Sequence, residues 1–524
     1  MASLLDGFYR AATSDPLRLA FTVAEREFSY GAVLSQVQAT AGWLRRQGIV
    51  TNKRVGILSA RNHLAFEAIL ATIWTGACYV PLNVKMPPAR LQNMIDRIDL
   101  SALLVDEAGA ALLSDGLTLA SQVAVLAGTS KKDSFFAERE LPGCGDVAET
   151  VQYADPFDNK NNDGAYVMFT SGTTGEPKAI LVTFGNLHAY LSFQQHRYQI
   201  NSTDRLSQLF ELSFDASVFD FLMALNHGAS FHVVPDNQIM APAKFIRDKQ
   251  LTLWFGVPST IAFMDKMKQL VSNSLPTLRL AIFGGEPLPL SSLRAWQRAA
   301  PGCVVDNVYG PTEATVTCFV QRCAEPLLIT PGRDVIAIGK PYAGSYGAIL
   351  DEQGHFLVRG TVGEIAIAGD QVARGYFGDE ALTEKKFVNL VHPAYGVKRW
   401  YRTGDLGSED ADGVFHHLGR FDNQVKVSGF RVELEDVEAW LRRVSGVDAV
   451  AVIPFPVEAG SAKGLVAFIA GNVDGQQVRA ELRAQLPSYM VPKRICIVAG
   501  LPQTLNGKVD RKKLVTLLER EDLL

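Results

Sequence analysis

The order of apolar and polar positions along the first third of the chain predicts helices and strands in alternation. Apolar residues recur at helical spacing over residues 30–47 and 64–75, and a glycine follows each stretch, as is common after the last turn of a helix. Short apolar runs at residues 21–23, 27–29 and 54–58 predict strands, the first two of them paired as a hairpin. Alternation of this kind is typical of a sheet whose faces are covered by helices.

The pattern changes twice in the second half of the chain. Between residues 329 and 419, short apolar segments are separated by glycines, which predicts an all-β region, either a small barrel or a sheet. The remaining residues return to a mixed pattern, with helices expected at 432–444 and 475–485 and strands at 447–454 and 465–470. The sequence therefore predicts a large α/β part with a β-rich region, followed by a smaller part of mixed α and β structure.

Size and composition narrow the class of protein. A chain of 524 residues is long enough to bury more than one hydrophobic core. Its formal net charge of −4 argues against non-specific binding to nucleic acid. We expect no membrane span, because no apolar run approaches roughly 18 to 20 residues, and no signal peptide, because charges come too early at the N-terminus. The six cysteines are scattered without a zinc-binding spacing, so reduced thiols in a cytoplasmic protein are expected.

The most distinctive stretch is residues 166–179, which read Y-V-M-F-T-S-G-T-T-G-E-P-K-A. The apolar half predicts a short buried strand, and the small hydroxylated residues after it have little apolar surface to bury. Such a turn presents backbone N–H groups and hydroxyls to one point, which suits a polyphosphate, and Lys178 adds a positive charge. The simpler interpretation is a solvated turn after a strand. The spacing excludes a P-loop, and a G-x-G-x-x-G dinucleotide fingerprint is absent.

The motif T-S-G-T-T-G-E-P-K resembles the phosphate-loop signature of the adenylate-forming superfamily, which includes acyl-CoA ligases, luciferases and the amino-acid adenylation domains of nonribosomal peptide synthetases. Ala179 stands where this family usually has glycine. Four later motifs match as well: N-V-Y-G-P-T-E-A-T, Y-R-T-G-D-L, G-R-F-D-N-Q-V-K-V-S-G and N-G-K-V-D-R. The resemblance implies two α/β/α-type sheets and a small β-barrel in residues 1–421, followed by a small mobile α+β domain in residues 422–524.

The resemblance also implies sites for ATP and Mg²⁺. Tyr309 would stack on adenine, Asn307 would bond the amino edge of the base, and Asp405 would accept ribose hydroxyls. Glu313 would hold Mg²⁺, because a hard cation prefers carboxylate oxygen. From the residues alone, Thr312 is equally well an ordinary helix N-cap, and Asp405 a carboxylate in a surface turn. The residues implied for the ATP site are Thr170, Ser171, Gly172, Thr173, Thr174, Gly175, Lys178, Gly285, Glu286, Asn307, Tyr309, Gly310, Thr312, Glu313, Asp405 and Arg420.

Three residues are implied as catalytic, namely Lys508, Thr170 and Glu313. On its own, a lysine near a C-terminus is usually an exposed surface charge. The reaction nevertheless needs a cation, because the attacking carboxylate and the α-phosphate are both negative. The resemblance makes Asp422 the hinge of the small domain, and it implies that the loop leading to Gly429 enters the active site for a second half-reaction.

The segment F-D-A-S-V-F-D, residues 214–220, distinguishes amino-acid activation from the activation of plain acids. Asp215 matches the aspartate that pairs with the substrate α-ammonium in amino-acid adenylation domains, and the alternative is an N-cap for the following helix. A desolvated ion pair is costly to break, so Asp215 should reject plain carboxylic acids. The implied pocket is otherwise apolar, with room made by Gly284. Its other residues are Ala216, Phe219, Phe255, Ile282, Val308, Val316 and Thr317, with Lys508 on the substrate carboxylate.

These matches predict an enzyme that converts ATP and an amino acid to aminoacyl-AMP and pyrophosphate, and then passes the aminoacyl group to the phosphopantetheine thiol of a carrier protein. The pocket resembles those for isoleucine or valine, followed by leucine or 2-aminobutyrate. We expect the carrier to act in trans, or the sequence to be an excised part, because no carrier-like segment follows. The alternatives are a D-alanine–carrier protein ligase, an acyl-CoA-ligase-like enzyme, and a non-catalytic nucleotide-binding relative, which would be expected to lack Lys508 or Glu313.

Overall fold

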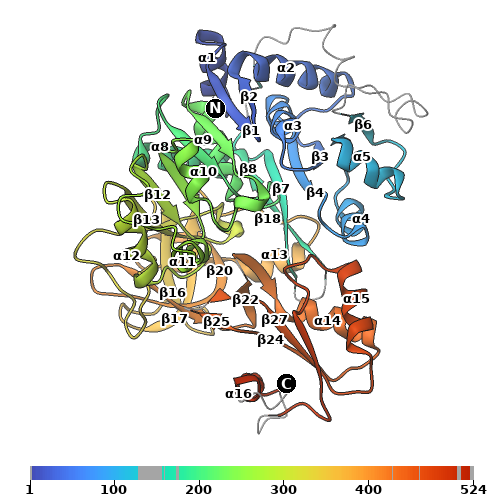
Figure 1. The fold of residues 1–524 in the computed structure, drawn as a ribbon, viewed down its shortest axis with the longest axis vertical. Helices are drawn as coiled ribbons and strands as arrows, with labels where there is room; N and C mark the ends of the chain where they lie inside the picture. The colour runs from blue at the N-terminus through green and yellow to red at the C-terminus, as the bar shows by residue number, and fades with distance from the viewer. Residues whose placement is uncertain are drawn as a thin grey trace.

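The computed structural model describes residues 3–127, 156–157, 160–172, 176–427, 429–458, 461–503 and 509–519. Two large sheets build the N-terminal part, an antiparallel sheet follows, and two small sheets with their helices form the C-terminal part. The C-terminal part, coloured orange to red, lies below the N-terminal sheets in Figure 1. This arrangement confirms the predicted α/β class with a smaller C-terminal part.

The first large sheet has a parallel centre and antiparallel strands at its edges. Its strands β10, β11 and β12 are buried along their whole length, which explains why they read as short continuous apolar runs. The predicted hairpin near the N-terminus is confirmed as β1 and β2. From edge to edge the strands are β15 (Lys340–Pro341), β14 (Phe319–Arg322), β13 (Val304–Tyr309), β12 (Leu280–Phe283), β11 (Leu253–Gly256), β9 (Arg205–Gln208), β10 (Ser230–Val233), β1 (Leu19–Val23) and β2 (Arg26–Ser29).

The second large sheet carries the distinctive stretch near its centre. Strand β7 is the predicted apolar strand, and it pairs antiparallel with β8, so the small hydroxylated residues form the connection between these two strands. The strand predicted at residues 54–58 is β3. From edge to edge the strands are β18 (Gly375–Tyr376), β8 (Lys178–Thr183), β7 (Gly164–Thr170), β4 (Cys78–Asn83), β3 (Arg54–Ser59), β5 (Ala102–Val105) and β6 (Ala124–Ala127).

Helices α3 (His63–Trp74) and α9 (Ser217–Asn226) are buried on nearly all sides, as expected for helices without a polar face. The ring of Phe66 in α3 lies 5.8 Å from that of Phe221 in α9 and 4.8 Å from that of Phe231 in β10. Helix α3 also packs on β3 and β4, so this helix pair joins the two large sheets (Figure 1). The packing fixes the start of α9, two residues after Asp215.

The helices predicted at residues 30–47, 64–75, 432–444 and 475–485 are present as α2, α3, α14 and α15, with boundaries within two residues of the predicted ones. The helix expected from residue 432 begins at Leu434, because the residues before it form the strand β23. Besides α3 and α9, the described helices are α1 (Asp6–Ser14), α2 (Tyr30–Arg46), α4 (Pro88–Arg97), α5 (Glu107–Ser114), α8 (Phe184–Tyr198), α10 (Ala243–Asp248), α11 (Pro258–Lys266), α12 (Leu290–Ala299), α13 (Glu380–Lys386), α14 (Leu434–Ser445), α15 (Gly475–Gln485) and α16 (Arg511–Glu519), with 3-10 turns η1 (Asp236–Gln238) and η2 (Thr312–Ala314).

The β-rich region is an open antiparallel sheet, so the predicted small barrel is wrong for the described residues. A barrel requires its two edge strands to pair with each other, whereas here the edge strands lie on opposite sides of the central pair β17 and β20. The long strand β20 pairs with β17, β19 and β21 along different parts of its length. The strands are β16 (Ser345–Leu350), β17 (Val362–Gly369), β20 (Gly396–Glu409), β19 (Phe387–His392) and β21 (Phe415–Arg420).

The C-terminal part contacts the N-terminal sheets through the hairpin β22–β23 and through helix α14. Arg90 of α4 and Asp436 of α14 form an ion pair of 3.3 Å in which both side chains are buried.

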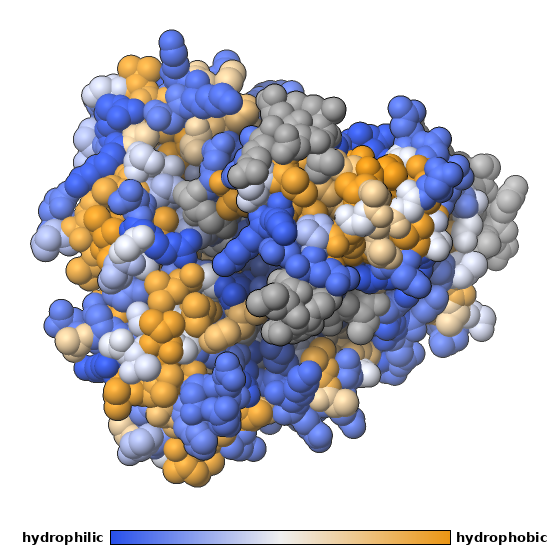
Figure 2. All heavy atoms as spheres, turned by 90° about the horizontal axis from the view of Figure 1, so that it is seen from below, coloured by the Kyte–Doolittle hydropathy of each residue, from blue (hydrophilic) through white to orange (hydrophobic). Residues whose placement is uncertain are grey.

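Hydrophobic patches on the face seen from below are separated by hydrophilic ones (Figure 2). One small sheet contains β23 (Phe430–Glu433), β22 (Gln424–Val427), β26 (Ser461–Ala462) and β25 (Val457–Glu458), and the other contains β24 (Val450–Pro454), β27 (Leu465–Ile469) and β28 (Arg494–Ile497).

Two composition-based predictions can be compared with these residues. Every helix in the described ranges is too short or too polar to traverse a lipid bilayer. Cys144 lies outside the described residues, and the other five cysteines are free thiols. These are Cys78, Cys303, Cys318, Cys323 and Cys496.

Candidate active site

A cavity of about 420 Å³ lies between the two large sheets and the hairpin β22–β23. It is lined by residues that follow the carboxyl ends of β11, β12 and β13, by the end of β7, and by the segment before α9. The carboxyl ends of neighbouring parallel strands meet at one edge of a sheet, where ligands of α/β proteins commonly bind. Most of the residues predicted for ATP and for the amino acid line this cavity, although they span most of the chain.

The phosphate loop begins at the cavity wall. Thr170 ends β7, and its Oγ1 is buried without a hydrogen-bond partner, so this hydroxyl remains available to a ligand. Gly172 allows a tight turn, because a Cβ there would lie 2.0 Å from the carbonyl oxygen of Glu176. Ser171 also lines the cavity, and Lys178 lies in β8. The predicted loop residues Thr173, Thr174 and Gly175 lie outside the described residues.

The residues predicted to recognise adenine line the same cavity. Asn307 donates its Nδ2 hydrogen to the carbonyl of Ala337 at 2.9 Å, while its Oδ1 is buried without a partner. This unsatisfied acceptor suits an exocyclic amino group, because a buried polar atom without a hydrogen bond is unfavourable. Tyr309 presents its ring to the cavity from the end of β13. Gly310 permits close packing, since a Cβ there would lie 2.5 Å from the Cα of Thr317.

Gly285 and Glu286 follow β12 at the opposite side of the predicted adenine site. Gly285 has a φ of +79°, which favours glycine. The Glu286 carboxylate accepts a hydrogen bond of 2.9 Å from the backbone N–H of Ser259, in the first turn of α11. Its other oxygen accepts a bond of 2.7 Å from the hydroxyl of Ser461 in the C-terminal part. Glu286 therefore also connects the two parts of the molecule, a role that the sequence did not indicate.

Asp405 and Arg420 form the predicted ribose end of the site. Arg420 donates to Asp405 and to Asp422, and the hydroxyl of Tyr309 also donates to Asp405. Burial alone would raise the pKa of Asp405, but the charge of Arg420 and hydrogen bonds from His417 and Tyr309 hold that pKa well below its usual range. Asp405 is 6% exposed, which excludes the alternative of a carboxylate in a surface turn.

Replacing Asp405 by alanine is expected to lower the free energy of unfolding by about 1–3 kcal/mol, because Arg420 and Tyr309 lose a buried acceptor, while Arg420 keeps its two hydrogen bonds to Asp422. Urea unfolding of the two proteins measures this difference. The matched control is Asp412→Ala, which removes an exposed carboxylate from the turn between β20 and β21. If Asp405→Ala lowered the free energy of unfolding no more than the control does, the buried contacts of Asp405 with Arg420 and Tyr309 would not stabilise the fold.

Glu313 is fully buried, and both of its carboxylate oxygens have partners. Arg431, from β23, donates from Nη1 to Oε2 at 2.9 Å, and the hydroxyl of Tyr376 donates to Oε1 at 2.8 Å. Burial would raise the pKa of Glu313, but the charge of Arg431 and the hydrogen bonds outweigh it and lower that pKa to about 2. The carboxylate is therefore ionised and held by a guanidinium group from the C-terminal part.

Mg²⁺ would depend on Glu313 and on substrate phosphates. The described residues contain no group of three or more histidine, cysteine, aspartate or glutamate side chains placed to hold a metal ion. One carboxylate suits Mg²⁺, which is usually bound by one or two carboxylates together with phosphate oxygens and water. The Glu313 oxygen that faces Arg431 would be open to a metal after that side chain moved away.

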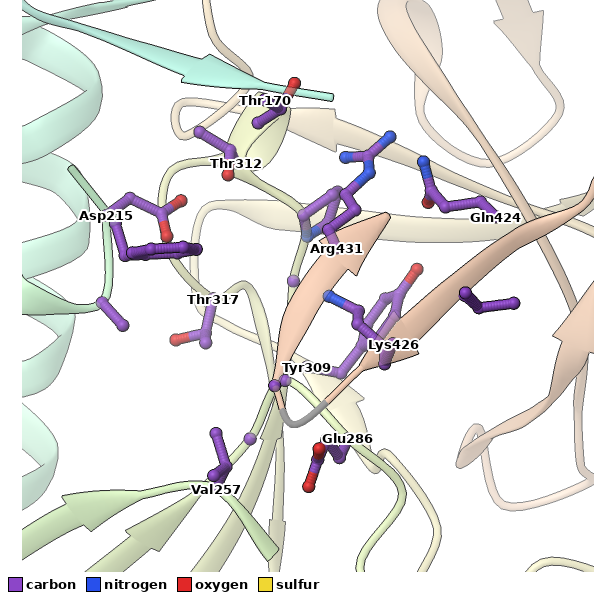
Figure 3. Close-up of a pocket in the computed structure, with 18 of the residues that line it drawn as sticks. Thr170, Asp215, Val257, Glu286, Tyr309, Thr312, Thr317, Gln424, Lys426 and Arg431 are labelled. Atoms are coloured by element: carbon purple, nitrogen blue, oxygen red, sulfur yellow. The ribbon is translucent and has the colours of Figure 1, made fainter. Parts of the chain in front are cut away.

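The hairpin β22–β23 enters the cavity, in agreement with the expectation for the loop leading to Gly429. Lys426 and Arg431 project from it into the cavity, and the guanidinium of Arg431 points to the side of Thr170 and Thr312 rather than toward Tyr309 (Figure 3). Burial, helped by the charge of Arg431, lowers the pKa of Lys426 to about 8. The sequence did not single out Lys426 or Arg431, because a charged hairpin has the same sequence pattern whether it is exposed to solvent or inserted into a cavity.

Asp215 faces the cavity from the segment before α9. The helix begins at Ser217, and Ala216 is its capping residue, so the alternative of an N-cap at Asp215 is excluded. The Oδ2 atom of Asp215 is buried without a hydrogen-bond partner. Burial raises the pKa of this carboxyl, and a hydrogen bond with Thr312 and the charge of Lys426 offset part of that effect. The arrangement offers one free carboxylate oxygen to a cationic ligand.

The apolar residues predicted for the amino-acid pocket differ in their positions. Phe219 and Ile282 are buried but do not line the cavity, and Phe219 packs edge-on against Phe255, with ring centroids 5.5 Å apart. Gly284 does not simply make room for a ligand, because a Cβ there would lie 2.7 Å from Cγ2 of Val308. The predicted pocket residues that line the cavity are Asp215, Ala216, Phe255, Gly284, Val308, Val316 and Thr317.

The loop between β13 and β14 is held in an unusual conformation. Thr315 and Val316 have φ values of +56° and +66°, which β-branched residues rarely adopt. Gln371 holds the loop through two hydrogen bonds. Its backbone carbonyl accepts from the Thr315 hydroxyl at 2.6 Å, and its side-chain Nε2 donates to the backbone carbonyl of Thr317 at 2.8 Å. The Thr317 hydroxyl is bonded to the hydroxyl of Tyr342 at 2.7 Å. Strain of this kind is stored at functional sites when the surroundings enforce it.

Lys508 lies outside the described residues. Its described neighbours Gln503 and Val509 form an isolated antiparallel bridge. The roles implied for Lys508 therefore remain predictions.

Comparison with known proteins identifies the family of the chain. Residues 8–377 match the family model described as AMP-binding enzyme, and residues 436–508 match that of the AMP-binding enzyme C-terminal domain. Syringomycin synthase SyrB1 of Pseudomonas syringae pv. syringae is 32% identical over 527 residues, which cover 98% of this chain and 81% of SyrB1. Malpinin synthetase of Mortierella alpina is 31% identical over 97% of this chain, which spans only 6% of that longer protein.

Two solved structures are similar over nearly the whole chain. The Vibrio cholerae adenylation domain AlmE, solved in complex with glycyl-adenosine-5'-phosphate, has 31% identity and a TM-score of 0.89, covering 99% of this chain and 98% of AlmE. Holo-PA1221, a nonribosomal peptide synthetase protein with adenylation and PCP domains, has 26% identity and a TM-score of 0.79, covering 98% of this chain and 84% of that one.

Proposed function

The chain belongs to the AMP-binding enzyme family as an ATP-dependent amino-acid adenylating ligase, and from that premise we propose that it activates an aliphatic L-amino acid. In the first half-reaction, an oxygen of the amino-acid carboxylate bonds to the α-phosphorus of ATP, and the bond to pyrophosphate breaks. The product is an aminoacyl-AMP. In the second, the sulfur of a carrier-bound phosphopantetheine bonds to the acyl carbon, AMP departs, and the thiol proton is released.

One observation carries the choice of an amino acid over a plain acid. The Oδ2 atom of Asp215 is buried in the cavity wall without a partner. A buried acceptor is unfavourable until a donor reaches it, and an α-ammonium group supplies both a donor and the opposite charge. A plain carboxylic acid supplies neither, so it would leave Asp215 unsatisfied.

The aliphatic side chain is proposed from the apolar wall beyond Asp215. Phe255, Val308 and Val316 line it without a charged group among them. The Thr317 hydroxyl already bonds to Tyr342, so it does not require a polar substrate. The neighbour AlmE was solved with a glycyl adenylate, and the present proposal differs in the size of the side chain that the pocket accepts.

ATP–pyrophosphate exchange with each of the twenty amino acids, 2-aminobutyrate and D-alanine tests this proposal. We expect isoleucine and valine to give the highest rates, with leucine and 2-aminobutyrate within roughly 10- to 200-fold, because one methylene in an apolar pocket is worth only that much. Highest exchange with an acidic, basic or large aromatic amino acid would overturn the aliphatic assignment. Highest exchange with D-alanine would favour a D-alanine–carrier protein ligase instead.

The proposed nucleotide site combines residues that line the cavity with Glu313 and Lys178. Asn307 would accept from the adenine amino group through its free Oδ1, Tyr309 would stack on the base, and Asp405 with Arg420 would hold the ribose. Gly285, Glu286, Gly310 and Thr312 would enclose the base, and residues 170–175 with Lys178 would hold the phosphates. Mg²⁺, bound by Glu313, would neutralise phosphate charge.

The proposal includes two domains, residues 1–421 and 422–524, with Asp422 as the hinge and the phosphopantetheine arm of a carrier protein as the second substrate. Asp422 accepts two hydrogen bonds from Arg420, at 2.6 and 2.7 Å, which fixes the chain at the entry to the C-terminal part. The hairpin β22–β23 lies in the cavity, as expected for the second half-reaction. We therefore propose that the structure represents the arrangement used for that step. The similarity to PA1221, which contains a PCP domain, supports a carrier as the partner.

A further inference from the structure

The strand β23 occupies groups that the first half-reaction would need. Arg431 is paired with Glu313, the proposed Mg²⁺ ligand, at 2.9 Å. The hydroxyl of Ser171 donates to the carbonyl of Arg431 at 3.0 Å and accepts from the N–H of Glu433 at 3.2 Å. Lys178 lies 3.5 Å from the carboxylate of Glu433. One strand of the C-terminal part therefore engages both the metal-binding carboxylate and the polar groups of the phosphate loop.

Glu313 needs a positive partner in every state of the enzyme. It is fully buried, and an unpaired carboxylate in that position would be strongly unfavourable. Tyr376 satisfies Oε1 and Arg431 satisfies Oε2. A divalent cation on Oε2 would repel the guanidinium at this distance, so the metal and Arg431 exclude each other at Glu313.

We propose that Arg431 is a positioning residue for the second half-reaction: it replaces Mg²⁺ as the cation on Glu313, and thereby makes insertion of β22–β23 dependent on departure of magnesium pyrophosphate. The inference rests on the proposed two-step function. It adds to that function that Glu313 binds Mg²⁺ in the first step and Arg431 of the C-terminal part in the second. Arg431 then holds Lys426 and the rest of the hairpin in the cavity while the thiol reacts.

Arg431→Met removes the charge and keeps the aliphatic stem. We expect its amino-acid-dependent ATP–pyrophosphate exchange to stay within about twofold of wild type, while transfer of the aminoacyl group to pantetheine falls roughly 10- to 100-fold, because the hairpin is no longer held in place. Arg431→Lys, which keeps the charge, should recover part of the transfer. Arg483→Met, which changes an exposed arginine of α15, is the matched control.

Hydrogen–deuterium exchange of the peptide covering residues 424–433 provides a readout that does not depend on turnover. In the wild-type protein with AMP, this segment should be protected, and added magnesium pyrophosphate should remove the protection. In Arg431→Met it should exchange quickly under both conditions. This comparison separates a positional role from a general loss of folding, because the peptides of β24 and β27 should keep their protection in all variants.

Several outcomes would overturn the inference. If Arg431→Met lost ATP–pyrophosphate exchange and aminoacyl transfer equally, Arg431 would not act selectively in the second half-reaction. The same conclusion would follow if its transfer rate stayed within twofold of wild type. Unchanged protection of residues 424–433 on addition of magnesium pyrophosphate to the wild-type protein would show that metal and hairpin do not compete. Absence of ATP–pyrophosphate exchange with every amino acid would instead contradict the proposed function itself, so the two failures are distinguishable.

Discussion

Replacing Asp215 by alanine is expected to lower kcat/KM for the amino acid on the order of 10²–10³, with little change in ATP binding. The loss follows from breaking a desolvated ion pair, which typically costs about 3–5 kcal/mol when one partner is removed. In the structure this carboxylate has a buried oxygen without a partner, and the α-ammonium of the substrate is the group that we propose to satisfy it. Amino-acid-dependent ATP–pyrophosphate exchange at varied substrate concentration measures the effect.

The pH dependence of the wild-type enzyme provides a second measurement of the same interaction. Burial raises the pKa of Asp215, so the carboxyl becomes protonated at a higher pH than an exposed aspartate. As the pH falls through that raised value, the charge that attracts the ammonium is lost, and KM for the amino acid should rise. The KM for ATP should not follow this profile.

The control for Asp215 is Asp115→Ala, which removes an exposed carboxylate from the end of α5. It should leave both the exchange rate and its pH profile unchanged. If Asp215→Ala kept its kcat/KM for isoleucine within tenfold of wild type, the assignment of Asp215 to the ammonium group would fail.

Much of the fold was predictable because its local patterns have one physical solution. A helix that is apolar on all sides, such as α3, has to be buried, and the apolar run of β7 followed by small polar residues has to end at a surface or a site. The role predicted for Asp215 came from the family resemblance instead, because an aspartate just before a helix is equally typical of an N-cap. The prediction of a barrel was wrong because short strands show the same alternation of apolar and polar residues in an open sheet and in a closed barrel.

The parts that the sequence did not indicate depend on contacts between distant segments. Arg431 and Glu313 are separated by 118 positions, and their ion pair exists only because the C-terminal part docks with β23 in the cavity. Phe219 and Ile282 were assigned to the pocket wall, but their side chains are buried behind it. The second role of Glu286, as a contact to Ser461, likewise depends on where the C-terminal part lies.

Replacing Lys508 by alanine is expected to lower the rate of adenylate formation by roughly 10²–10³, as for the loss of one group that stabilises transition-state charge. The transfer of an aminoacyl group from chemically prepared aminoacyl-AMP to pantetheine should change only severalfold. Among the described residues, the cations of the C-terminal part that line the cavity are Lys426 and Arg431 of the hairpin. The segment flanking Lys508, with Gln503 and Val509, contributes no described residue to the lining.

This difference between the two half-reactions follows from geometry, because the hairpin and the C-terminal lysine would have to approach the same phosphates. In the structure the hairpin already fills that space, with Ser171 and Lys178 engaged by β23, so the role proposed for Lys508 requires another arrangement of the C-terminal part. Lys513→Ala, which removes an exposed lysine of α16, is the control and should affect neither half-reaction. Equal losses in adenylate formation and in transfer for Lys508→Ala would mean that a single arrangement serves both steps, and this would contradict the proposed hinge at Asp422.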